Sequence, residues 1–109
     1  MHYQRSHITT ETFEDFIVNG KPAGEVHWLV NDSSRGDGLY SGIWRTGPLT
    51  FDYVFPGDEI FHALRGELHI AIRDSETIIV REGDIIAFDK GIKTTWTIPE
   101  VFVKFFVIT

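Results

Sequence analysis

Residues 51–72 of this chain read FDYVFPGDEIFHALRGELHIAI, and this stretch decides the fold. The segment from Pro56 to Asp58 is a turn signal, and Arg65-Gly66 is a second one in which glycine supplies the unusual φ angle. The runs around these turns are rich in aromatic and branched residues, which is typical of short antiparallel strands. We therefore predict a hairpin of strands 59–64 and 67–73, closed by a two-residue loop at Arg65-Gly66.

Counting outward from that loop assigns every residue of the hairpin to one of two faces. Phe61 would lie opposite Ile70, and Glu59 opposite Ile72. One face then carries Glu59, Phe61, Ala63, Leu68, Ile70 and Ile72, and the other carries Ile60, His62, Leu64, Glu67, His69 and Ala71. The first face is apolar except for Glu59. An isolated carboxylate is costly among apolar side chains, so Glu59 is the most informative residue of the sequence.

The rest of the chain shows the same alternation of apolar runs and turn residues. Further strands are predicted at residues 25–30, 39–45, 76–81, 85–88, 93–98 and 101–108, with a tight turn at Pro99-Glu100 between the last two. Eight or nine short strands, spaced about ten residues apart, are typical of a sandwich or barrel. We therefore expect an all-β fold in a single domain covering residues 1–109.

Two segments are predicted in less detail. The N-terminal arm, residues 1–23, could form one helical turn capped by Thr10, or it could run as an extended strand; the sequence leaves both open. The polar run from Asn31 to Gly38 is predicted to be a loop and the most mobile part of the chain.

Composition and charge narrow the choice of partners. Acidic residues outnumber basic ones 16 to 10, and the basic residues are scattered singly, so nucleic acid and anionic membrane surfaces are poor partners. Cysteine is absent, which excludes disulfides, thiolate metal sites and cysteine nucleophiles. No apolar run approaches membrane-spanning length, and the first residues lack the apolar core of a secretion signal. We therefore expect a cytoplasmic protein with no membrane partner.

Two motifs in this chain resemble those of the cupin superfamily. A turn glycine, the acidic strand residue Glu59 and then Gly66 are similar to the first cupin motif, and residues 82–91 (EGDIIAFDKG) resemble the second. The likeness is closer to small cupins related to ureidoglycine aminohydrolase and the ethanolamine-utilisation cupin, and it covers residues 39–108. The matching pieces are SGIW at 41–44, Tyr53 with Glu59, LRGE at 64–67, TWTI at 95–98, and the closing Glu100, Lys104 and FFV at 105–107.

The resemblance implies a small cupin (jelly-roll) β-barrel with a ligand pocket at one mouth, commonly in a dimer. It also implies where a cupin metal would bind, and there the chain departs from the family pattern. The positions that match the metal-binding histidines hold Tyr53, Phe55 and Thr94, and Glu59 alone is kept. A transition metal needs three or four protein ligands, and these three side chains do not replace neutral imidazole. We therefore expect no metal and no other cofactor.

His62 and His69 would lie opposite each other on the second face of the predicted hairpin. Cross-strand histidines can chelate a metal, but they can also form a partly buried pair at a sheet or subunit contact. The second interpretation is favoured because both residues lie on the face opposite Glu59, outside the predicted pocket.

Glu59 has two interpretations. It could be structural, held by a cation such as Arg45 or by backbone amides. It could instead be functional, since a desolvated carboxylate in a pocket can act as a general base or bind an amine or hydroxyl. The sequence leaves both open, and Glu59 is the candidate catalytic residue.

The candidate ligand-binding residues are Tyr53, Phe55, Glu59, Thr94 and Trp96. Alternation from Thr94 places Trp96 on the interior, although aromatic residues in a small barrel more often form the core than a binding site. If Pro99-Glu100 is a two-residue loop, Lys104 falls on the face opposite Trp96. An ion pair with Glu100 or a subunit contact is then expected for Lys104.

Two classes of function are consistent with the sequence. The favoured one is a small-molecule-binding cupin of unassigned ligand, without the usual cupin metal. The alternative is a cupin enzyme acting on a small amide, amine or sugar-like substrate, with Glu59 as acid/base or metal ligand and with Tyr53 and Thr94 orienting the substrate. The sequence shows no nucleophile–base pair, phosphate loop or pair of carboxylates that would require catalysis. Whether the protein is an enzyme therefore stays open. The N-terminal arm could cover a sheet edge of a second copy, and we expect a homodimer.

Overall fold

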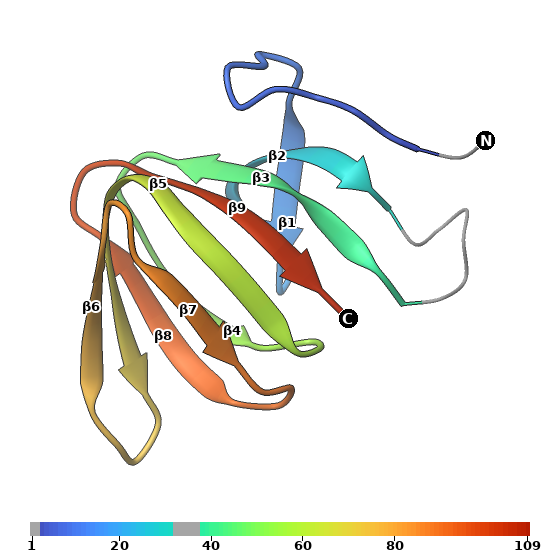
Figure 1. Cartoon of the computed structure of the whole chain (residues 1–109). Coiled ribbons are helices and arrows are strands. Elements are labelled where there is room, and N and C mark those ends of the chain that lie inside the picture. Colours follow the sequence, from blue (N-terminus) through green and yellow to red (C-terminus); the bar gives the residue numbers. More distant parts are fainter. Residues whose placement is uncertain (1–2, 32–37) are drawn as a thin grey trace.

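The computed structural model of the chain describes residues 3–31 and 38–109, and these ranges contain nine β-strands and no helix (Figure 1). The strands are β1 (Glu14–Val18), β2 (Lys21–Val30), β3 (Tyr40–Thr46), β4 (Leu49–Val54), β5 (Glu59–Ile72), β6 (Thr77–Arg81), β7 (Ile85–Phe88), β8 (Lys93–Ile98) and β9 (Phe102–Ile108). The predicted all-β fold is confirmed. The loop predicted at Asn31 to Gly38 lies, apart from its two end residues, outside the described residues. No helix in the described part is long and apolar enough to cross a membrane.

The predicted central hairpin is wrong, because residues 59–72 form one continuous strand of 14 residues, β5. Its first half pairs with β9 and β7, and its second half pairs with β8 and β6. Phe61 therefore does not lie opposite Ile70; its partners are Phe106 and Ile86. Arg65-Gly66 looked like a loop because glycine at a positive φ angle is common both in hairpin turns and in β-bulges.

The predicted division into two faces is nevertheless confirmed, for a different physical reason. Ala63 and Arg65 pair with the consecutive residues Lys104 and Val103, so Leu64 is an extra residue that forms a β-bulge. One extra residue moves all the side chains that follow it to the opposite face of the strand. The predicted two-residue loop at Arg65-Gly66 gives the same assignment of residues to faces. The side chains of Glu59, Phe61, Ala63, Leu68 and Ile70 are accordingly all buried in the interior.

Gly66 is the residue that lets β5 change its course after the bulge. Its φ angle is +84°, which side chains rarely adopt, and a Cβ atom at this position would overlap the backbone carbonyl of Val101. Glycine is therefore required where β5 leaves one sheet and enters the other.

β5 belongs to both sheets of the barrel. One sheet has the order β1-β2-β3-β9-β5-β7, and the other has the order β4-β8-β5-β6. Figure 1 shows β5 running beside β9 and then turning toward β8 and β6. The prediction of a β8–β9 hairpin at Pro99-Glu100 is wrong, because β8 pairs with β4 and β5 while β9 pairs with β3 and β5. The segment between them instead crosses from one sheet to the other.

The N-terminal arm takes the extended alternative. β1 and β2 form an antiparallel hairpin in which Val18 pairs with Lys21 across a two-residue loop. The loop residues, Asn19 and Gly20, both have positive φ angles (53° and 76°), as the favoured two-residue hairpin turns require.

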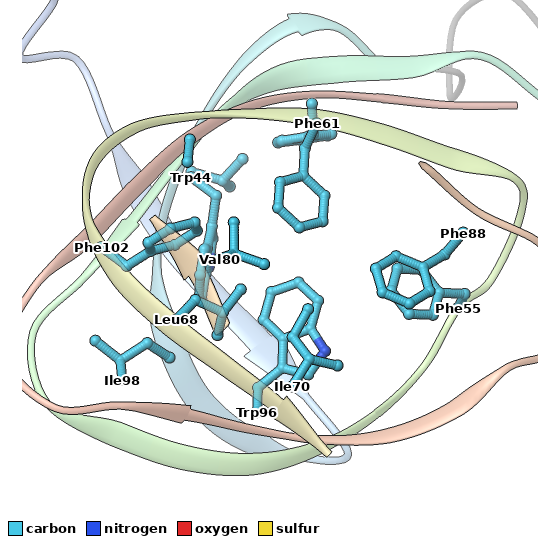
Figure 2. Packing of buried hydrophobic residues seen from close by; sticks show 13 residues of the cluster. Trp44, Phe55, Phe61, Leu68, Ile70, Val80, Phe88, Trp96, Ile98 and Phe102 are labelled. Carbon is cyan, nitrogen blue, oxygen red and sulfur yellow. The ribbon is translucent and has the colours of Figure 1, made fainter. Parts of the chain in front are cut away.

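The core between the two sheets is dominated by aromatic rings (Figure 2). Phe55 and Phe88 stack with their ring centroids 4.5 Å apart, and Phe61 extends from β5 toward Trp96 on β8 with centroids 5.9 Å apart. Each such side chain contributes about 1.5–3 kcal/mol by leaving water. This packing fixes the positions of the strands that carry the site.

Candidate functional site

Glu59 and Lys104 form a buried ion pair at the centre of the barrel. The Nζ atom of Lys104 lies 2.5 Å from Oε2 of Glu59, and the two side chains are 6% and 0% exposed. The hydroxyl of Tyr53 donates a hydrogen bond to the other carboxylate oxygen, Oε1, at 2.8 Å. Both oxygens of Glu59 therefore have a partner, and no buried side-chain nitrogen or oxygen in the described part of the chain lacks one.

The register of β5 and β9 brings this pair together. Lys104 pairs with Ala63 on β5 and with Trp44 on β3, so its side chain enters the interior between those of Phe102 and Phe106. The prediction that Lys104 lies on the face opposite Trp96, in an ion pair with Glu100 or at a subunit contact, is therefore wrong. It depended on the β8–β9 hairpin, which does not form.

Four aromatic rings surround the ammonium of Lys104. We call them the aromatic cage; its members are Phe61 and Trp96, each with its ring centroid 4.6 Å from Nζ, Phe106 at 5.3 Å and Trp44 at 5.5 Å. Ring faces attract a cation, and they do so more strongly when water is excluded. The ammonium is thus held by one carboxylate and by several ring faces.

Burial sets the protonation behaviour of this cluster. Desolvation lowers the pKa of Lys104, and the neighbouring Glu59 partly offsets that effect. Burial raises the pKa of Tyr53 well above its ordinary value, and the charge of Glu59 adds to the increase. Tyr53 therefore stays protonated and acts as a hydrogen-bond donor at physiological pH.

Arg45, predicted as a possible cation for Glu59, is bound elsewhere. Its Nε donates to Glu25 at 3.0 Å, its Nη1 lies 3.0 Å from a carboxylate oxygen of Glu11, and its guanidinium stacks on the ring of Phe13. Arg45 follows the inward-facing Trp44 on β3, so alternation directs its side chain outward. The prediction that Arg45 neutralises Glu59 is wrong.

Thr94 and Trp96 support Tyr53 from β8. The indole Nε1 of Trp96 donates to the hydroxyl of Thr94 at 2.9 Å, and that hydroxyl donates to the backbone carbonyl of Tyr53 at 2.7 Å. Phe55 is 1% exposed and stacks on Phe88. The structure therefore brings Tyr53, Glu59, Thr94 and Trp96 together and places Phe55 in the adjoining core.

A small cavity of about 40 Å³ opens beside the ammonium. Its walls are Phe16, Val26, Trp28, Trp44, Phe51, Tyr53, Trp96, Lys104, Phe106 and Ile108. A cavity of this size has room for about three water molecules. Glu59 is not on the wall; it lies behind Lys104 and Tyr53, so it reaches an occupant through these two side chains.

The cavity adjoins a wider groove of about 490 Å³ at the mouth of the barrel. Four residues line both spaces: Phe16, Trp28, Tyr53 and Ile108. The groove has the size of a small-molecule site, and the cavity is its apolar inner end, with Lys104 as the charged residue of the wall.

The sequence prediction missed several residues of this site, among them Lys104 and Trp28. In residues 102–108 (FVKFFVI), Lys104 alternates with Phe102 and Phe106, which signals an interior position. The intervening residues, at 103, 105 and 107, are equally apolar, so the pattern does not say which set faces inward. Trp28 is an aromatic residue in a predicted strand, and the sequence gives no sign that it faces a cavity.

His62 and His69 do not form the predicted cross-strand pair. They lie on the same strand, where His62 is exposed on the outside and His69 contacts Glu67 with 2.7 Å between Nε2 and Oε2. In the described residues, no group of three or more histidines and carboxylates could hold a metal ion. The side chains around Glu59 are phenol, benzyl, hydroxyl and ammonium groups, and this donor set does not fit a transition metal.

The two-sheet barrel with its mouth groove is the fold of the cupins. EutQ of Clostridium difficile superposes on this chain with a TM-score of 0.71 at 25% identity, over 86% of this chain and 75% of EutQ. A Salmonella typhimurium protein described as ethanolamine-utilisation protein Q gives 0.68 at 22% identity (89% and 93% covered), and a cupin-like protein of Thermotoga maritima gives 0.68 at 19% identity (80% and 70% covered).

The chain belongs to the EutQ-like cupin domain family, whose model matches residues 33–106. The resemblance to the ethanolamine-utilisation cupin that the sequence motifs carried is thereby confirmed. A search of the curated proteins finds no match for this chain.

Proposed function

We propose that this chain is a small-molecule-binding cupin whose site is organised by the Glu59–Lys104 ion pair in place of a metal ion. The observation that carries the proposal is the position of Lys104, which is the charged residue in the wall of an aromatic cavity that leads into a groove of ligand size.

The chemistry of the wall defines the kind of ligand. An ammonium has three N–H donors, and in the described residues its hydrogen bond goes to Glu59, so donors remain for an occupant. An oxygen acceptor, such as a carbonyl, hydroxyl or carboxylate oxygen, is suited to that end of the cavity. The other walls are almost entirely aromatic and aliphatic and suit a short apolar body.

The enzymatic alternative is supported by one specific arrangement. Glu59 accepts hydrogen bonds from Lys104 and Tyr53 at the same time, so a proton can pass between Lys104 and Glu59 while Tyr53 keeps its own proton and orients the carboxylate. In that alternative Glu59 is the acid/base residue, acting on the substrate through Lys104 and Tyr53.

The proposal includes a cytoplasmic homodimer built from single-domain subunits. The outer face of the first sheet supports it, since Ile60 on β5 and Ile85 on β7 are 55% and 73% exposed. Val107 and Phe105 on β9 pair with Ile60 and His62 and extend the same apolar face. A second copy would remove this face from water. The absence of cysteine suits a reducing compartment such as the cytoplasm.

A direct test is to identify what the purified protein carries and what it binds. Native mass spectrometry would detect a co-purified small molecule, and tryptophan fluorescence would follow titration with small carbonyl compounds, carboxylates and alcohols. Trp28→Ala, which removes a cavity wall, should weaken binding at least about tenfold, whereas Ile85→Ala on the outer face should not change it. Equal affinity of both variants would contradict the proposed site.

A further inference from the structure

We propose that Lys104 is a carbonyl-capturing amine that forms an imine with a small aldehyde or ketone entering the cavity. This inference rests on the proposed function, because it assigns a substrate class to the same site. Its geometrical basis is that the nucleophile lies on the cavity wall while its proton acceptor lies behind it.

The positions of the three polar groups match the needs of that reaction. Lys104 lines the cavity, and the Glu59 carboxylate, 2.5 Å from its Nζ, is within reach of the ammonium proton. Tyr53 also lines the cavity and keeps its hydroxyl on the same carboxylate. An entering carbonyl would therefore meet an amine and a phenol, with one carboxylate connecting the two.

The exclusion of water from Lys104, and not the groups that hold its ammonium, favours the uncharged amine that the reaction needs. The side chains facing Nζ from the surrounding strands are the four rings of the aromatic cage and the two titratable groups Glu59 and Tyr53. In the described residues, Lys104 is the one cation in this interior. Burial also lowers the pKa of Lys104, which is how lysines that form imines are commonly activated.

The reaction balances without any further reagent. Lys104 transfers a proton to Glu59, and the amine lone pair then attacks the carbonyl carbon to form a C–N bond, while a second proton passes from the attacking nitrogen to the carbonyl oxygen. The resulting carbinolamine loses its hydroxyl as water, using the proton held by Glu59, and the C=N bond forms. Ammonium and carbonyl compound are thus converted to a protonated imine, paired with the restored Glu59 carboxylate, and water, with no change in oxidation state.

The cavity limits the size of the carbonyl compound. Room for about three water molecules corresponds to a compound of about three or four non-hydrogen atoms, and a longer one would have to extend past Trp28 into the mouth groove. The apolar walls favour a short alkyl chain on the carbonyl carbon. The substrate class is therefore short-chain aldehydes and ketones.

Reductive trapping tests the inference. The full chain is incubated near neutral pH with propionaldehyde and sodium cyanoborohydride, which reduces an imine to a stable propyl-lysine. Peptide mass spectrometry then compares labelling at Lys104 with labelling at the exposed lysines Lys21 and Lys93. We expect Lys104 to be labelled at least about tenfold faster, because a propionaldehyde molecule bound in the cavity is held next to its amine.

Two variants control the experiment. The double variant Glu59→Gln/Lys104→Met removes the buried pair as a whole, so it should fold and show labelling at the exposed lysines only. Lys93→Arg should leave the rate at Lys104 unchanged. If Lys104 is unlabelled, or labelled no faster than Lys21, the inference is wrong.

A parallel fluorescence titration with propionaldehyde, without the reductant, separates the two proposals. Binding without a trapped adduct at Lys104 would reject imine formation and leave the binding function standing. If neither propionaldehyde nor any compound of the titration panel binds, both the inference and the proposed function fail.

Discussion

Lys104, in the middle of β9, provides the counter-ion of Glu59, the first residue of β5, across 2.5 Å of the barrel interior. In the metal-binding cupins that the sequence motifs resemble, the residue matching Glu59 is a metal ligand. In this chain the cation next to the carboxylate is a side chain of the protein itself.

The Glu59–Lys104 pair should behave as a unit in stability measurements. Glu59→Gln or Lys104→Met leaves one charge buried without its partner, which should lower the free energy of unfolding by about 3–5 kcal/mol. The double variant should recover most of that loss, because it leaves no unpaired charge. Chemical denaturation of the four proteins gives the coupling energy.

The exposed pair formed by Glu11 and Arg45 provides the control for this cycle. Its carboxylate side chain is 81% exposed, so Glu11→Gln should cost less than about 1 kcal/mol. Strictly additive losses in the Glu59/Lys104 double variant would show that the pair is not coupled in the folded protein.

Tyr53 should remain protonated in the folded protein at pH values where exposed tyrosines ionise. Its pKa is raised by burial first and by the charge of Glu59 second. The stabilisation linked to its protonated form is therefore complete below the unfolded value near pH 10, and it is lost as the pH rises from there toward the raised folded value.

Ultraviolet absorbance of tyrosinate measures this directly. The chain has three tyrosines. Tyr53→Phe should therefore leave unchanged the increase in absorbance that precedes alkaline unfolding, and it should reduce only the increase that accompanies unfolding. A loss of amplitude in the folded-state titration would show that Tyr53 ionises in place.

Gly66→Ala should be far more destabilising than Gly83→Ala, although both glycines have a positive φ angle. At Gly83 no atom lies within 4 Å of an added Cβ, so the cost is the backbone strain alone, about 1–2 kcal/mol. At Gly66 the Cβ also meets the backbone of Val101, which raises the expected cost to about 3–5 kcal/mol. Thermal and urea unfolding of the two variants would compare them, and equal losses would mean that β5 does not approach the 99–101 segment closely.

Removal of divalent metal ions should change neither stability nor ligand affinity. The reason is the donor set around Glu59, in which an ammonium and a phenol take up the carboxylate oxygens. Dialysis against a chelator, followed by a thermal melt and a binding titration, checks this. A stoichiometric transition metal lost together with ligand affinity would show that the chain has metal ligands outside this donor set, for instance in residues 31–38.

The protein should be a homodimer at micromolar concentration. Ile60→Glu/Ile85→Glu places charges on the exposed apolar face of β5 and β7, and it should convert the dimer to a monomer in multi-angle light scattering. Val54→Glu, at an exposed position on β4 in the other sheet, serves as the control and should leave the dimer intact. A monomeric wild-type protein would refute the proposed assembly.

The sequence by itself determined the all-β class and most strand positions, because alternation and turn residues are local properties. The strands predicted at 85–88 and 93–98 match β7 and β8 residue for residue. It also identified Glu59 as an interior carboxylate, since a single acidic residue on an apolar face is visible without knowing which strands pair. Tyr53 and Thr94 could be named because they occupy positions that match the metal-binding histidines of the cupins this chain resembles, and alternation from Thr94 added Trp96.

Only the tertiary structure decided the partner of Glu59. A positive φ angle at glycine is compatible with a hairpin loop and with a bulge, and the two alternatives give the same faces but different neighbours. The bulge makes β5 continuous, β5 joins both sheets, and its pairing with β9 is what carries Lys104 into the interior. Strand pairing depends on contacts between residues far apart in the chain, and local sequence patterns do not contain that information.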